Sequence, residues 1–144
     1  MKEQNADHSF SFSCRHTVAF RFCGRVLFGM IGKIDMDAKM ATIVSRIPNE
    51  ADLCIPIESL IGYLDTARLM QSPSWRDRFL AEYIQVTIRK DALARFIELK
   101  MTSDIPALAS EASEAMELMK HQFSVMTEYQ EILRMRAKLE QIEI

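Results

Sequence analysis

The sequence has few of the residues on which catalytic and cofactor sites commonly depend. Its four glycines are too scattered to form a glycine-rich phosphate-binding loop. It also lacks a G-x-S-x-G segment that would place a serine nucleophile on a sharp turn. We therefore expect a protein that is not an enzyme and that binds no cofactor.

The three cysteines, Cys14, Cys23 and Cys54, form no C-x-x-C pair and leave an odd thiol. Cys14 and His16 would share one face of a strand and could supply two zinc ligands, but the other spacings match no zinc finger or ribbon. Cysteine is also a common core residue. We expect reduced thiols and no metal site.

Long apolar runs and a strong net charge are absent as well. No run approaches the roughly 18 apolar residues of a membrane-spanning helix, and the polar, acidic start lacks the apolar segment of a secretory signal. We expect a cytoplasmic protein that makes no membrane contact. The formal net charge of −2 argues weakly against general binding to nucleic acid.

The composition that remains is that of an ordinary globular protein, with 49% apolar and 26% charged residues. A length of 144 residues predicts one domain, or one domain with an appendage. We divide the chain into a disordered start (1–8), an α+β domain (9–100) and a C-terminal helix (101–144) for packing or dimerisation. The expected fold is α+β, with an N-terminal curved antiparallel sheet (a small half-open barrel or a meander), short helices and a long C-terminal amphipathic helix.

Alternating apolar and polar residues predict the strands of this sheet. Residues 9–22 alternate throughout, which predicts an extended strand with a kink near residues 15–17. A three-residue turn at 23–25 would keep the next apolar residues on the same buried face: Val26, Phe28, Met30 and Ile34. Gly29 and Gly32 predict a bulge or strong curvature. Segments 40–47 and 53–57 predict two more strands, and Pro56 marks the second of these as an edge.

The middle of the chain mixes helical and extended patterns. Residues 58–64 predict a short helix that residues 65–70 would extend. Residues 84–88 alternate between apolar and polar, which fits either a fifth strand or more helix, and their β-branched composition favours the strand. Asp91 would then cap a separate helix over residues 92–100.

Beyond Asp104, apolar residues recur every three or four positions, which predicts one long amphipathic helix. About 38 helical residues would span roughly 57 Å. A compact domain of this size is smaller, so part of the helix should project and need a partner. Self-association is favoured, and packing within the chain stays open. The predicted partner-binding residues are Met116, Met119, Phe123, Met126 and Leu133, with Phe123 as the central anchor.

The spacing of this stripe continues at Gln130 and Ala137, a polar and a small residue, so the stripe does not fit a long coiled coil. A second set of apolar residues drifts around the helix and favours globular packing or a short bundle: Tyr129, Ile132, Met135, Leu139 and Ile142.

By elimination, these patterns predict a small protein–protein interaction module: an adaptor, a chaperone-like protein or a regulator. It would act as a homodimer through its C-terminal helix, or with another protein. The alternative is a nucleic-acid-binding regulator whose phosphate contacts come from one strand face that carries Arg15, Arg21 and Arg25. A third hypothesis is a small ligand-binding or enzymatic barrel around His16.

Overall fold

The computed structural model describes residues 12, 14–45, 49–102 and 112–144. In this part of the chain, a five-stranded antiparallel sheet is followed by short helices and two long helices. The predicted α+β class, with its N-terminal sheet and long C-terminal helix, is therefore confirmed. The predicted disordered start, residues 1–8, lies outside the described residues.

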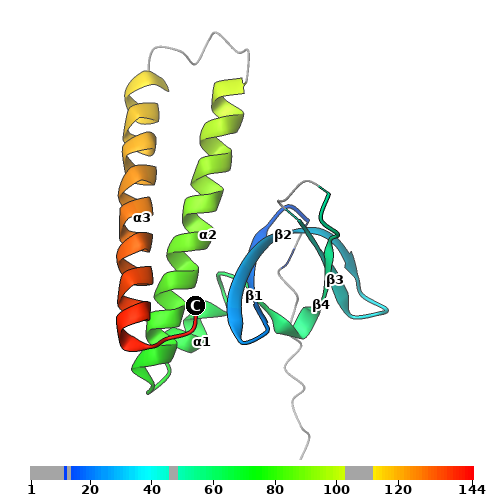
Figure 1. Cartoon of the computed structure of the whole chain (residues 1–144). Helices are drawn as coiled ribbons and strands as arrows, with labels where there is room; N and C mark the ends of the chain where they lie inside the picture. Colours follow the sequence, from blue (N-terminus) through cyan, green and yellow to red (C-terminus); the bar gives the residue numbers. More distant parts are fainter. Residues whose placement is uncertain (1–11, 13, 46–48, 103–111) are drawn as a thin grey trace, which may run out of the picture.

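The sheet contains β1 (Thr17–Phe22), β2 (Arg25–Asp35), β3 (Met40–Val44), β4 (Leu53–Pro56) and β5 (Leu60–Ile61). The spatial order is β4-β3-β2-β1-β5, and each neighbouring pair is antiparallel. The sheet curls strongly but does not close into a barrel (Figure 1). β4 is an edge strand, as Pro56 predicted, because proline cannot donate a hydrogen bond to a further strand.

A two-residue turn joins β1 to β2, where three residues were predicted. Phe22 pairs with Arg25, and the turn residues Cys23 and Gly24 both have positive φ, 50° and 80°, as in a tight hairpin. The shorter turn reverses the parity of β2. Val26 and Phe28 therefore pack toward the helix α2 (Trp75–Thr102) instead of continuing the inner face, and the prediction of an unbroken buried face was wrong.

Two glycines allow β2 to bend, as predicted. A bulge interrupts its pairing with β3 between Ile31 and Lys33, at Gly32. At Gly29, an added Cβ would lie 2.1 Å from Cγ2 of Ile43, far inside van der Waals contact. The close approach of the two strands therefore requires a glycine at this position.

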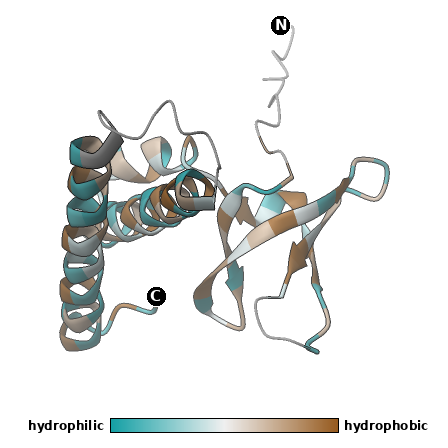
Figure 2. Cartoon of the chain, turned by 90° about the horizontal axis from the view of Figure 1, so that it is seen from above, coloured by the Kyte–Doolittle hydropathy of each residue, from teal (hydrophilic) through white to brown (hydrophobic). Residues whose placement is uncertain are grey.

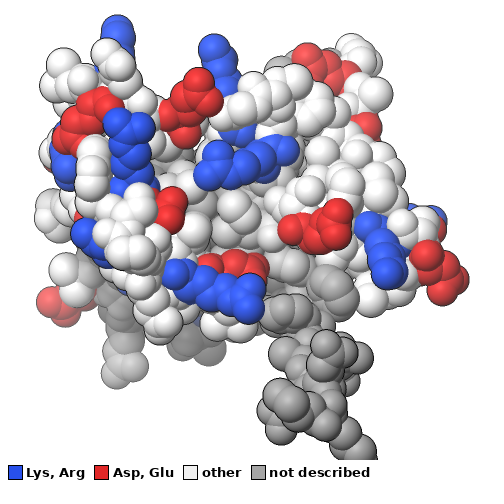
Figure 3. All heavy atoms as spheres, turned by 90° about the horizontal axis from the view of Figure 1, so that it is seen from below, with Lys and Arg blue, Asp and Glu red and all other residues white. Residues whose placement is uncertain are grey.

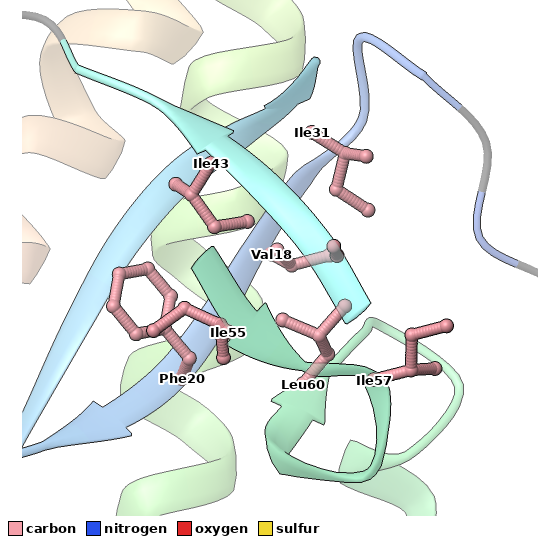
Figure 4. Packing of buried hydrophobic residues seen from close by; sticks show 8 residues of the cluster. Val18, Phe20, Ile31, Ile43, Ile55, Ile57 and Leu60 are labelled. Carbon is pink, nitrogen blue, oxygen red and sulfur yellow. The ribbon is translucent and has the colours of Figure 1, made fainter. Parts of the chain in front are cut away.

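The inner face of the curved sheet forms one hydrophobic core. The core contains buried apolar side chains from all five strands and the segment after β4, and Figure 4 labels most of them: Val18, Phe20, Ile31, Ala41, Ile43, Ile55, Ile57 and Leu60. β1 is buried on its other face too, because Ala19 packs with Leu80 and Ile84 of α2. Both faces of β1 are thus covered, which explains its run of four buried residues.

Short elements connect the sheet to the helices. A 3₁₀ turn, η1 (Ile57–Ser59), leads into β5, which pairs with β1 through Ala19–Ile61 and Phe20–Leu60. The prediction of a helix over 58–64 was therefore wrong, because Leu60 and Ile61 pair with β1, a strand that is distant in sequence. The helix α1 (Thr66–Met70) lies where the extension was predicted.

The helix α2 runs unbroken from Trp75 to Thr102, so the predicted strand over 84–88 and the separate helix after Asp91 were wrong. α2 lies between the sheet and α3 (Ala112–Glu140), as Figure 1 shows. Ile84 packs toward the sheet, whereas Val86 packs toward α3. A helix that is apolar on two sides gives the alternation that resembles a strand.

The helix α3 runs antiparallel to α2, and the two extend together past the sheet (Figure 1). Seen from above, the curled sheet and the helical hairpin stand side by side (Figure 2). After α3 the chain folds back: the Ile142 amide donates to the Ala137 carbonyl at 2.8 Å, and Ile142 and Ile144 pack onto the clusters between helices and sheet. Among the described helices, none is long and apolar enough to cross a membrane.

Candidate functional site

The facing sides of α2 and α3 have the residue spacing of a coiled coil. Along α3, buried and half-buried residues recur at alternating intervals of three and four, and we call them the inner seam: Met116, Met119, Phe123, Met126, Gln130, Leu133 and Ala137. Near the sheet, Leu133 and Ala137 pack against Phe79, Tyr83 and Val86 of α2. Such spacing lets side chains of one helix enter the gaps of the other.

The five residues predicted to bind a partner all belong to this inner seam. Leu133 is fully buried and Met126 packs against the same cluster. Met116, Met119 and Phe123 are half-buried farther from the sheet. The part of the seam near the sheet thus contacts α2 of its own chain, which is the packing that the sequence left open. Partner binding through Met116, Met119 and Phe123 stays a prediction.

Gln130 does not interrupt the seam, because α2 supplies polar partners opposite it. Its side-chain amide donates to the Thr87 hydroxyl at 2.6 Å, and its carbonyl oxygen accepts from Lys90 Nζ at 2.5 Å. Thr87 in turn donates to the Tyr83 carbonyl at 2.8 Å. Gln130 is only 1% exposed, so these bonds replace the water that it loses. A satisfied polar layer of this kind fixes the register of two helices.

The outward face of α3 carries a second row of large apolar residues, which we call the outer row. Four residues recur at every seventh position, with exposed fractions of 65%, 48%, 48% and 82%: Leu118, Val125, Ile132 and Leu139. A seven-residue interval keeps side chains almost in line along a helix. The row runs for about 31 Å, and hydrophobic segments recur along α3 in Figure 2, at the left.

The sequence interpretation found only part of this row. Ile132 and Leu139 were in the drifting second set, whereas Leu118 and Val125 were not included. The seven-residue interval was the missed signal, because it holds for Leu118, Val125, Ile132 and Leu139 alike and a search for three- and four-residue steps does not find it.

Polar contacts border the hairpin interface beside the outer row. The Tyr129 hydroxyl donates to the Glu82 carboxylate on α2. This bond, with partial burial and the carboxylate charge, raises the pKa of Tyr129, while Arg136 opposes the shift. Arg134 donates to the Tyr83 hydroxyl at 3.2 Å, and that bond raises the pKa of the guanidinium. Both contacts join α2 to α3 and so hold the outer row in position.

The three arginines predicted to form one strand face lie at two ends of the sheet. Arg21 and Arg25 flank the β1–β2 turn and are exposed. Arg15 precedes β1 and has a positive φ of 71°. It lies six residues before Arg21, which is roughly 20 Å along an extended chain. On the face shown in Figure 3, basic and acidic side chains are interspersed. Nucleic-acid binding through these arginines stays a prediction.

His16 and the cysteines do not form a cluster. His16 is exposed just before β1 and does not belong to the packed interior of the sheet. Cys14, Cys23 and Cys54 are all exposed. Within the described ranges, no three histidine, cysteine or acidic side chains are grouped so that they could hold a metal ion.

The hairpin is also the part of the chain that is similar to a known family. The model of the Sequestin family matches residues 73–139, which contain all of α2 and nearly all of α3. The matched segment is just under half of the chain and includes none of the sheet. No curated protein and no solved structure matches the chain significantly.

Proposed function

We propose that this protein is an interaction module that works by binding, and that it acts as a homodimer through the outer row of α3. The observation that carries the proposal is the row itself: Leu118, Val125, Ile132 and Leu139 at seven-residue intervals, all with about half or more of their surface in water. A straight apolar row of this length is typical of a surface that contacts another helix.

A second copy of the chain suits the row better than an unrelated helix. A twofold interface must be self-complementary. In an antiparallel pair of α3 helices, Leu118 of one copy would meet Leu139 of the other, and Val125 would meet Ile132. All four apolar positions then find an apolar partner. Covering each side chain contributes roughly 1–2 kcal/mol.

The charges beside the row favour the antiparallel arrangement. A parallel pair would place each charged residue opposite its own copy, so that Glu128 would face Glu128 and Arg136 would face Arg136. In the antiparallel pair Glu128 lies opposite Tyr129 instead. Glu117 then lies opposite Glu140, but each of these two carboxylates already pairs with a basic residue of its own helix. Like charges that face each other across an interface are unfavourable.

The similarity to a family points to the same region. The name Sequestin suggests binding or holding another molecule, and the matched residues 73–139 are the hairpin that carries the row. We therefore place the interaction function in the hairpin and a supporting role in the sheet, whose core packs against α2.

A charge introduced into the row tests the proposal. Ile132→Glu should convert a dimer into a monomer of 16.6 kDa with an unchanged circular dichroism spectrum, because Ile132 is exposed on α3 and its loss leaves the inner seam intact. Ser124→Glu is the matched control: it adds the same charge to an exposed position on the opposite flank of the same helix, and it should leave the dimer intact. Light scattering that gives one mass for all three proteins would contradict the proposal.

A further inference from the structure

A groove lies where the start of β1, the loop after β5 and α2 meet. It has a volume of about 310 Å³, which is at the lower end of the range for small-molecule sites. Its walls are mostly apolar and aromatic, with Phe12 before β1, Tyr63 and Leu64 after β5, and Ile88 and Ala92 on α2. His16 and Arg95 add two nitrogen-bearing side chains to the lining, and Thr17 adds a hydroxyl group.

Arg95 is the best-positioned polar group of the groove. Its guanidinium reaches from α2 to the start of β1, where one terminal nitrogen donates to the Arg15 carbonyl and the other donates to the Thr17 hydroxyl at 2.6 Å. Its Nε donates to the Asp91 carbonyl at 3.3 Å. These three bonds hold the plane of the guanidinium in place, and each terminal nitrogen has a second N–H group in addition to the one used.

These acceptors are uncharged oxygens, so they orient the guanidinium without neutralising it. A fixed guanidinium presents parallel N–H groups that match the two oxygens of a carboxylate. The charge next to an apolar wall selects for a molecule that has both an anionic group and an apolar body.

We propose that this groove binds a small amphipathic carboxylate: a flat, apolar ring system with one carboxylate, in which the carboxylate meets Arg95 and the ring lies between Tyr63, Leu64 and Ile88. This inference is independent of the contact between two α3 helices. A change in the groove is therefore expected to leave the mass of the protein in solution unchanged.

The neighbourhood of Arg95 supplies a control. Arg95 also borders a second groove of about 300 Å³, which Met30, Val44 and Ala94 line. Ala92 belongs to the first groove and Ala94 to the second. Ala92→Phe and Ala94→Phe add the same side chain two residues apart, and each fills only one groove.

The test uses naphthalene-1-acetate as the probe, with titration calorimetry and ligand-observed NMR on the full chain. Saturable binding is expected, with a loss of at least about tenfold for the neutral naphthalene-1-acetamide, because a charge-assisted bond is removed. Arg95→Gln should weaken binding of the acid to a similar extent, whereas Arg89→Gln, at an exposed position on the same helix, should not.

Ala92→Phe should abolish binding and Ala94→Phe should leave it unchanged. This pair keeps the test decisive even if Arg95→Gln disturbs the contact between α2 and the sheet. No binding of the acid to the unaltered protein at millimolar concentration would overturn the proposal. Equal binding of acid and amide would do so as well, and so would loss of binding in Ala94→Phe with retention in Ala92→Phe.

Discussion

Gln130 on α3 donates a hydrogen bond of 2.6 Å to Thr87 on α2 and is the polar member of an inner seam whose other residues are apolar. Both residues are buried. Because Lys90 also donates to Gln130, one glutamine side chain satisfies groups on two successive turns of the opposite helix. The pairing explains why an apparent interruption in the apolar stripe of α3 lies inside the hairpin.

Removing Gln130 should therefore cost more than an average polar substitution. Gln130→Ala leaves Thr87 and Lys90 without this partner, and we expect a loss of about 2–3 kcal/mol in the free energy of unfolding. Urea titration measures the change. A double-mutant cycle with Thr87→Ala should give a coupling of about 1 kcal/mol; additive losses would mean that the two side chains contribute independently.

Two leucines on the same helix should respond in opposite ways to truncation. Leu133 is fully buried in the inner seam, whereas Leu139 is 82% exposed in the outer row. Leu133→Ala should cost about 2–5 kcal/mol of unfolding free energy, and Leu139→Ala should change it by less than about 0.5 kcal/mol, measured at concentrations low enough for a monomer. Similar losses of unfolding free energy in both variants would mean that α3 is rotated about its own axis relative to the arrangement described.

The Tyr129–Glu82 contact should make the stability of the protein fall as the pH rises in the alkaline range. The pKa of Tyr129 is raised above its ordinary value of 10.0 by the bond to Glu82. Because this pKa is higher in the folded protein than in the unfolded chain, the bond stabilises the fold fully below about pH 10. The stabilisation is lost as the pH rises through the pKa of Tyr129 in the folded protein. Tyr129 is partly exposed, so we expect about 1 kcal/mol at most.

Tyr129→Phe is the matching variant, because it removes only the hydroxyl. The difference in unfolding free energy between the unaltered protein and Tyr129→Phe should be constant from pH 7 to 9 and should shrink above pH 10. A difference that grows with alkaline pH would show that the ionised tyrosine is favoured in the folded state.

The curvature of the sheet depends on the absence of a side chain at Gly29. An added Cβ would meet Cγ2 of Ile43 at 2.1 Å, so Gly29→Ala should destabilise the protein by about 1–3 kcal/mol. Ile43→Ala removes that methyl group, and the double variant should recover part of the loss relative to the sum of the single changes. Thermal unfolding of the four proteins gives the coupling, and strict additivity would show that the methyl group is not the obstacle.

The sequence predicted the curved sheet well where its determinants were local. The edge position of Pro56 and the bulge at Gly32 both follow from residues whose backbone preferences act within a few positions. The β1–β2 turn was predicted one residue too long, because the positive φ values of Cys23 and Gly24 define a hairpin that the alternation pattern does not distinguish from a longer loop.

The errors have a common physical cause, which is contact between elements that are distant in sequence. Ile84 and Val86 alternate with polar residues because α2 contacts the sheet with one and α3 with the other. Leu60 and Ile61 form a strand only because β1 lies next to them. In the same way, Gln130 looked like a break because its partners, Thr87 and Lys90, are about 40 residues away in sequence. Tertiary contacts of this kind leave no local signal.

Cysteine cross-linking on the outer row tests the central claim most directly. In a background with Cys14, Cys23 and Cys54 changed to serine, Val125→Cys and Ile132→Cys variants are mixed and oxidised. The antiparallel pairing of α3 helices predicts a disulfide-linked heterodimer of the two variants, with little cross-linking of either variant to itself. Self-cross-linking of each variant in preference to the mixed product, or no cross-linking at all at micromolar concentration, would contradict a dimer built on this row.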